Sequence, residues 1–293
     1  MKKLIFVIMI LSIFVFGKNI NKTYSGIDEL EIELVLSSCE IIKSNDTKIH
    51  VNVEYTYNED VYKVVFKEKT DKLVVEEKFE DNDDNDGESI WKISIPDGME
   101  VEFSSATGCL TLKGINAKLE GSSGTGCLTG ENLSGKYELG SGTGNIEVTD
   151  SEGDFELNSG TGNVKISNSK GEFDANSGTG KVIAENIIIL DSADMGSGTG
   201  KVIVINVQGK EFELEISSGT GNVELDLDGK KLDGHYILES RDKKGRIVSP
   251  FKIENTEEID EGDSKRIRKS FTIGKSNTEI SLSSGTGKVV LKK

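Results

Sequence analysis

The sequence contains few of the residues that build metal centres and active sites. Its 293 residues include two histidines, three cysteines, two prolines and one tryptophan. Neither His50 nor His235 lies at ligand spacing from a cysteine, which argues against a Cys/His metal centre. No serine, histidine and aspartate stand out as a catalytic set, because the serines are elements of a repeat. These absences favour a binding or structural protein over an enzyme.

Basic residues are also scarce. The chain has 35 Lys and Arg against 51 Asp and Glu, a formal net charge of −16. Binding to nucleic-acid phosphates needs a basic surface, so we expect no nucleic-acid partner. The 33 glycines against two prolines suit a β protein rich in turns.

Only one long apolar run is present, at residues 4–16. It follows Met1-Lys2-Lys3, and its 13 residues are too few to span a bilayer comfortably. We expect a signal peptide at 1–17, cleaved after Gly17, which would leave a mature charge of 33 − 51 = −18. No cysteine follows the run, so a lipoprotein anchor is not indicated. The mature chain should be exported, periplasmic or at the cell surface, with no transmembrane segment; the alternative is a retained amino-terminal anchor.

A four-residue phrase, Ser-Gly-Thr-Gly, recurs through most of the chain. Its first copy reads Ser-Ala-Thr-Gly, and the threonines lie 18, 18, 18, 18, 20, 21 and 66 residues apart, at Thr107, Thr125, Thr143, Thr161, Thr179, Thr199, Thr220 and Thr286. A fixed period near twenty residues is typical of a solenoid, in which each coil buries its apolar face against its neighbours.

Apolar residues alternate on both sides of each threonine, which predicts two short strands per coil. Like residues fill each column, so equivalent strands should be parallel and in register. We predict an all-β fold: a right-handed, single-stranded parallel β-solenoid with an amino-terminal β cap region. The glycines should supply special backbone angles at the corner, and the serine before them should form a buried hydroxyl ladder.

The expected organisation has three parts: the signal peptide, an amino-terminal β region at 18–98 that covers the first coil, and the repeat array at 99–293. Strand-like alternation in the second part occurs at residues 27–36, 48–57, 61–67, 72–79 and 89–95. The array should carry an insertion at about 226–278 that contains one coil and a protruding polar hairpin or loop. Residues 271–273 and 279–293 should then build a last coil.

An acidic residue lies on the outward face five residues before each threonine except the last, where Ser281 stands. This column comprises Glu102, Glu120, Glu138, Glu156, Asp174, Asp194 and Glu215. Strand spacing would set its members about 4.8 Å apart, where neighbouring charges in water repel by roughly 1 kcal/mol. The column is therefore a candidate site for Ca²⁺ or for a cationic partner. The alternative is a solvated face, with Lys118 and Lys136 relieving part of the repulsion.

Two cysteines, Cys109 and Cys127, occupy one column on adjacent coils. In-register parallel strands would place their Cα atoms about 4.8 Å apart, within disulfide range. An exported protein permits this bond, which makes the pair a candidate disulfide and leaves Cys39 single.

Two further charged segments favour plain interpretations. Residues 81–87 resemble a calcium loop, but Ile93 stands where the loop needs glutamate and no helical pattern flanks it, so a solvated turn is favoured. A late basic cluster could contact an anionic glycan or lipid head group, or it could be a solvated hairpin; it comprises Lys243, Lys244, Arg246, Lys265, Arg266, Arg268 and Lys269.

The motif Ile93-Ser94-Ile95-Pro96, followed by coils of Ser-Gly-Thr-Gly-(Asn/Lys)-Val, resembles the bacterial putative-adhesin β-strand-repeat family. A late coil with Ser240 and Gly245-Arg246-Ile247 adds to the resemblance. It implies an exported envelope protein with a parallel β-helix-like fold and no established catalytic activity. Many members have aspartate where this chain has Asn or Lys after the second glycine.

From these observations we expect a non-enzymatic, exported binding or structural module of the cell envelope, with no cofactor other than a candidate Ca²⁺. Its partner would be an envelope or surface component, protein or glycan, and self-association through end coils or the acidic face is a further candidate. The alternative is a β-helix enzyme acting on polysaccharides, a lyase or hydrolase, which would need a concave groove with convergent carboxylates.

Overall fold

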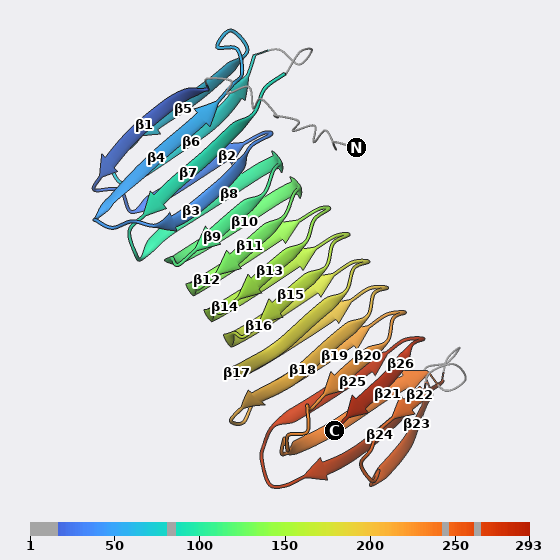
Figure 1. Cartoon of the computed structure of the whole chain (residues 1–293). Helices are drawn as coiled ribbons and strands as arrows, with labels where there is room; N and C mark the ends of the chain where they lie inside the picture. The colour runs from blue at the N-terminus through green and yellow to red at the C-terminus, as the bar shows by residue number, and fades with distance from the viewer. Residues whose placement is uncertain (1–16, 81–85, 242–245, 261–264) are drawn as a thin grey trace, which may run out of the picture.

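The computed structural model describes residues 17–80, 86–241, 246–260 and 265–293 of the chain. The predicted signal peptide at 1–17 therefore lies, except for Gly17, outside the described residues. The described strands form two layers. Because β17 (Val182–Ser197) contributes its first half to one layer and its second half to the other, hydrogen bonds join all of them into one large mixed sheet. Figure 1 shows the resulting elongated stack.

The first layer, called layer 1 below, contains the strand that precedes each Ser-Gly-Thr-Gly corner. In spatial order it comprises β5 (Tyr62–Glu68), β6 (Lys72–Phe79), β2 (Glu29–Leu34), β8 (Met99–Thr107), β10 (Asn116–Thr125), β12 (Ser134–Ser141), β14 (Glu152–Ser159), β16 (Lys170–Ser177), the second half of β17, β19 (Glu213–Ser218), β25 (Glu279–Ser284), β21 (Gly234–Arg241), β24 (Lys265–Ile273) and β23 (Asn255–Asp260).

The opposite layer, called layer 2, contains the strand that follows each corner. Its spatial order is β1 (Lys18–Ser25), β4 (Lys48–Tyr55), β7 (Ser89–Ile95), β3 (Ser38–Lys43), β9 (Leu110–Lys113), β11 (Leu128–Glu131), β13 (Ile146–Thr149), β15 (Val164–Ser167), the first half of β17, β18 (Val202–Gly209), β20 (Val223–Asp226), β26 (Lys288–Lys292) and β22 (Arg246–Val248).

The repeat array pairs in parallel and in register, as its columns predict. Leu157, for example, aligns with Leu139 and Ala175 on the neighbouring coils, and all three are buried. The aromatic members of the next inward column also stack: Phe155 lies 5.6 Å from Tyr137 and 5.9 Å from Phe173 between ring centroids. One continuous apolar core therefore fills the space between the layers.

The predicted serine ladder is confirmed from Ser123 onward, where it links each corner to the preceding coil, whereas the buried Ser105 hydroxyl has no hydrogen-bond partner among the described residues. The Ser159 hydroxyl donates to the carbonyl of Gly144 one coil earlier (2.8 Å) and accepts from the amide of Gly162 in its own coil (2.8 Å). The same pair of bonds recurs at Ser177, Ser197, Ser218 and Ser284. Each of these hydroxyls is thus satisfied by backbone groups on both sides.

The corner glycines have a different cause from the one expected. None of the glycines in the Ser-Gly-Thr-Gly phrases has a positive φ. Instead, a Cβ atom on Gly162 would lie 1.8 Å from the carbonyl oxygen of Gly144, and the equivalent glycines are equally close to the coil before them. Glycine is needed here because successive corners stack in backbone contact, not because of a left-handed conformation.

The opposite corner is where left-handed residues occur. Its column includes Asn132, Asp150, Asn168, Asn186 and Asn206, all with φ between 51° and 56°. Asparagine and aspartate tolerate this conformation better than other residues with a Cβ. Side-chain amides also link the coils, since Asn206 donates to Asn186 (2.7 Å) and Asn186 to Asn168 (3.1 Å).

At the amino-terminal end the parallel stack continues and then changes direction. β2 and β3 pair in parallel with β8 and β9, in the same register as the repeats. Beyond them, β5 pairs antiparallel with β6, and β4 pairs antiparallel with both β7 and β1. The strands expected within residues 27–95 are present as β2, β4, β5, β6 and β7, whereas β1 and β3 were not predicted. The domain boundary at residue 98 stays a prediction.

At the carboxy-terminal end the order of the coils differs from the expectation. β21 and β22 form a coil and β23–β24 an antiparallel hairpin, as predicted for the insertion. However, β25 and β26, the last strands of the chain, stack directly on β19 and β20, so they lie inside the β21–β22 coil. Phe271 and Ile273 belong to β24, which pairs antiparallel with β21 instead of contributing to the last coil.

Candidate functional site: the acidic face of layer 1

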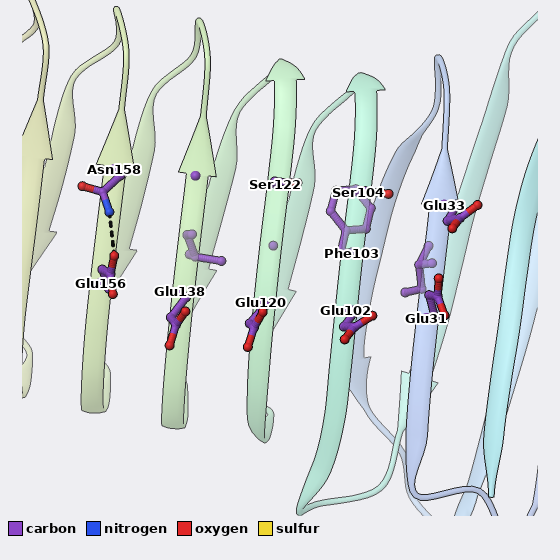
Figure 2. Close-up of a pocket in the computed structure, with 14 residues that line it drawn as sticks. Glu31, Glu33, Glu102, Phe103, Ser104, Glu120, Ser122, Glu138, Glu156 and Asn158 are labelled. Carbon is purple, nitrogen blue, oxygen red and sulfur yellow. Dashed lines mark hydrogen bonds between the residues drawn. The ribbon is translucent and has the colours of Figure 1, made fainter.

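The seven predicted acidic residues align as one column on the outward face of layer 1. Each faces the next across neighbouring parallel strands, from Glu102 in β8 to Glu215 in β19, and the column ends at Ser281 in β25. Figure 2 shows Glu102, Glu120, Glu138 and Glu156 projecting side by side from consecutive strands. We call this column the acidic ladder.

The structure adds one member that sequence reasoning missed. Glu31 in β2 pairs in register with Glu102, which extends the ladder by one rung. The signal was present, because Leu30-Glu31-Ile32 has the same apolar–acidic–apolar pattern as Leu214-Glu215-Ile216. It was overlooked because the segment precedes the first Ser-Gly-Thr-Gly phrase, by which the repeats were aligned.

The outer surface of the ladder is hollowed in two places. A groove of about 550 Å³ lies over its first half and is lined by Glu31, Glu33, Glu102, Glu120, Glu138 and Glu156, with small residues between them. A second groove, of about 360 Å³, lies over the other half. Its charged lining consists of one lysine and seven carboxylates: Lys136, Asp154, Glu156, Glu172, Asp174, Asp194, Glu213 and Glu215.

Lysines neutralise only part of this charge. The Lys72 ammonium lies 2.8 Å from Glu31 and 3.8 Å from Glu102, and Lys136 lies 2.8 Å from Glu138. Lys118, which was expected to relieve the ladder, pairs with Glu100 beside it instead. Within the described residues, no ion pair reaches the remaining members: Glu120, Glu156, Asp174, Asp194 and Glu215.

Protonation equilibria differ along the ladder. The hydrogen bond from Lys72 holds the pKa of Glu31 below its ordinary value, and the hydrogen bond that Glu33 shares with Glu31 raises the pKa of Glu33. Further along, loss of hydration raises the pKa of Asp174. Loss of hydration and the charges of Glu215 and Asp174 also raise the pKa of Asp194. Asp174 and Asp194 therefore bind protons more readily than isolated aspartates would.

Metal binding is not assigned to this face. In the part of the chain that the structure describes, no group of three or more His, Cys, Asp or Glu side chains is arranged to hold a metal ion. The Ca²⁺ hypothesis stays a prediction. The solvated turn predicted for residues 81–87 falls largely on residues 81–85, which lie outside the described residues.

The structure joins Cys109 and Cys127 in a disulfide, with their Cα atoms 4.6 Å apart. The bond connects adjacent coils at the corner before β9 and β11, one position after the second glycine. Cys39 is free and buried, and burial raises the pKa of its thiol. On later coils the column of the disulfide holds asparagine or lysine, and the Asn145 side chain there accepts from the amide of Asn163 (2.8 Å).

The late basic cluster is partly neutralised within the chain. Arg268 Nε lies 2.5 Å from Glu239 Oε1, and Arg266 Nη1 lies 3.5 Å from Glu239 Oε2. Lys243 and Lys244 lie outside the described residues. Among the described residues there is also no helix that is long and apolar enough to cross a membrane.

Comparisons with known proteins give matches only among solved structures. No family model and no curated protein matches the chain. A putative cell adhesion protein from Clostridium sporogenes ATCC 15579 is 15% identical, with 94% of this chain and 99% of that chain covered and a TM-score of 0.28. A putative adhesin from Parabacteroides merdae ATCC 43184 is 14% identical, with coverage of 96% and 98% and a TM-score of 0.42.

A putative lipid binding protein from Parabacteroides distasonis ATCC 8503 is 12% identical, with 96% and 98% covered and a TM-score of 0.39. Structures named as putative adhesins are thus among the matches. What each of them binds is not carried over to this chain at such identities and TM-scores. We therefore argue function from the acidic face itself.

Proposed function

We propose that the protein is a non-enzymatic, exported binding module of the cell envelope, and that the acidic face of layer 1 binds a cationic surface of its partner. The observation that carries this proposal is the acidic ladder, which continues in register from Glu31 to Glu215 with little neutralisation. Like charges about 4.8 Å apart on a rigid sheet repel one another. A cationic partner would relieve that repulsion along the whole face at once.

The finer features of the fold belong to the same proposal. We infer that the coils are right-handed, since parallel crossovers almost always are, and that the strands from β1 to β7 form a cap on the first repeat coil. An export signal at residues 1–17 would place the module outside the cytoplasm. Cell fractionation combined with protease treatment of intact cells would distinguish a surface location from a periplasmic one, and retention in the cytoplasm would overturn the export proposal.

The binding proposal is tested with a defined cationic probe, an octalysine peptide on a biosensor surface. The variant D174N/D194N/E215Q removes three ladder charges, and E131Q/E147Q/E185Q removes the same number from the outward face of layer 2. We expect the layer 1 variant to weaken binding at least about tenfold and the layer 2 control to change it about twofold or less. Equal losses in the two variants would mean that the probe senses only net charge.

The Ca²⁺ hypothesis has its own measurement. Thermal unfolding is followed during a calcium titration, with magnesium as the control ion. A midpoint that rises with calcium and not in D174N/D194N/E215Q would support a cation site on the ladder. An unchanged midpoint would remove it and leave the binding proposal intact.

A second candidate function, a polysaccharide-cleaving enzyme, is favoured by one observation. Glu31 and Glu33 line the larger groove, and their environments move their pKa values in opposite directions. A carboxylic acid beside a carboxylate is the pair of groups that glycoside cleavage uses, and because these two share a hydrogen bond, a substrate would have to separate them to the roughly 5 Å of a retaining enzyme. The test is release of reducing ends from a panel of polysaccharides, with E33Q expected to abolish it. No release from any of them would leave the binding function alone.

A further inference from the structure

The two ends of layer 1 expose unpaired strand edges of opposite charge. β5, at the amino-terminal end, is hydrogen-bonded within the described residues only to β6, and β23, at the other end, only to β24. Figure 1 shows these two strands at opposite ends of the stack. Each therefore presents a row of backbone amides and carbonyls that another strand can satisfy.

The charges on these edges are complementary. β5 carries Lys63 and Lys67 around the partly exposed run Val64-Val65-Phe66 and ends at the exposed Glu68, so its net charge is +1 (two lysines and one glutamate). β23 carries Glu257, Glu258 and Asp260 and no basic residue. The two lysines also pair with Glu80 and Glu76 in their own chain, but both keep about half of their side-chain surface exposed.

Strand directions allow β23 of one molecule to extend layer 1 of the next. β23 is antiparallel to β24, which is antiparallel to β21, so β23 runs in the direction of the parallel array. β6 is parallel to β2, and β2 is parallel to the repeat strand β8, so β6 also has the direction of the array. β5 is antiparallel to β6 and therefore runs in the opposite direction. Two molecules related by a translation along the stack would therefore bring β23 and β5 together as an antiparallel pair.

One register of this pair keeps the two faces of layer 1 continuous and satisfies charge and apolar contacts on the outward face. With Lys67 opposite Glu257, Val65 faces Ile259, and on the inward face Phe66 and Val64 meet Glu258 and Asp260. Pairing β5 with a second β5 about Val65 would instead set Lys63 against Lys67. Two copies of β23 would set Glu257 against Glu257 or Glu258 against Glu258. Like charges directly opposite destabilise a strand pair, so both symmetric arrangements are disfavoured.

From these observations we propose that the protein associates head to tail, with β23 of one molecule adding to β5 of the next as a new strand of layer 1. The occupant of each edge is a second copy of this chain. Because the contact is heterologous and translation does not close a ring, the product is a linear filament that continues the stack. The inference does not depend on the acidic ladder as a binding surface.

The experiment is sedimentation velocity of the full mature chain from about 5 to 500 µM, at about 20 and 500 mM salt. We expect species that grow with concentration at low salt and shrink at high salt, because the complementary charges are screened. E257K and K67E should each weaken association at least about tenfold. E131K is the matched control: it reverses an equal charge in the middle of layer 2, away from both edges, and should leave association unchanged.

The decisive experiment mixes the two charge-reversal variants. E257K sets a lysine at position 257 against Lys67 of the next molecule, and K67E sets a glutamate at position 67 against Glu257. In a mixture, the two changed edges can meet each other and the two unchanged edges can meet each other. Every contact between the two variants is then complementary, so association should return to near the wild-type level, as it should in the double variant. Thermal unfolding of each variant confirms that it is folded. A chain that stays monomeric at every concentration and salt, a mixture that does not recover, or an equal loss in E131K would overturn the proposal.

Discussion

At the residue scale, the Ser-Gly-Thr-Gly phrase combines two separate requirements of stacking. The serine must be small and polar because its hydroxyl joins the carbonyl of one coil to an amide of the next. The second glycine must lack a Cβ because the neighbouring corner is in backbone contact with it. Threonine, exposed between them, has no such constraint from the core. The Ser-Gly-Thr-Gly phrase is therefore the sequence that close stacking of successive corners requires.

Substitution of a corner glycine tests this explanation. In G162A the new methyl group would meet the Gly144 carbonyl oxygen at 1.8 Å, so the coils must separate. We expect a loss of at least about 2 kcal/mol in the free energy of unfolding, measured by urea denaturation. G140A is the control, since its Cβ would meet nothing closer than the Asn158 oxygen at 4.0 Å. Equal effects would show that stacking contact is not the cause.

The raised pKa of Asp194 leads to a pH-dependent prediction. The ordinary pKa of an aspartate is 3.8, and that of Asp194 is higher in the folded state, so the folded protein holds this proton more tightly than the unfolded chain does. The stability that this proton contributes is fully present below about pH 3.8 and is lost as the pH rises through the raised pKa. D194N removes the charge, so it should melt at the wild-type temperature near about pH 3 and at a higher temperature near about pH 7. A lower melting temperature at neutral pH would contradict the assignment.

At the element scale, each coil is an interchangeable layer held by its two neighbours. The strands β14 and β15 illustrate this, because their hydrogen bonds, aromatic stacking and serine bonds all go to the coils on either side. Stability in such an array is roughly a sum of coil and nearest-neighbour terms. Local links between coils therefore have local effects.

The disulfide is one such link. It closes a loop of 18 residues, which in the chain-entropy description stabilises the fold by about 3 kcal/mol. C109S/C127S should unfold at a correspondingly lower denaturant concentration than the oxidised protein. A reducing agent should lower the midpoint of the wild type and leave that of the double variant unchanged. A variant as stable as the oxidised wild type would show that the bond contributes nothing.

At the scale of the whole molecule, the array should accept another coil. Residues 145–162 form one complete period, and neighbours on both sides have the same register. A tandem duplication of this segment should fold and lengthen the stack by about 4.8 Å, with a larger denaturant m-value because more surface is buried. The control is a duplication one residue shorter, which turns the apolar columns outward and should aggregate. A soluble, folded control would contradict the register argument.

Much of this architecture was predictable from local pattern. The period, the alternation and the acidic column are all properties of one coil repeated, and a parallel register follows once each coil has the same length. β1 was missed because Lys18–Ser25 is polar, with only Ile20 and Tyr24 partly packed against the core. β3 was missed because it is short and follows a corner that lacks the repeated phrase.

What the amino-acid sequence determined by itself is the coil: a residue that recurs every 18 positions must meet its equivalent on the next strand, and so the acidic ladder and the disulfide column were visible in advance. Only the tertiary structure decided what happens at the ends. There β25 and β26 fill the slot beside β19 and β20, while β21 and β22 stack outside them. The physical reason is that a repeat period describes neighbours in the chain, whereas the order of the end coils depends on which distant strands compete for the same open edge.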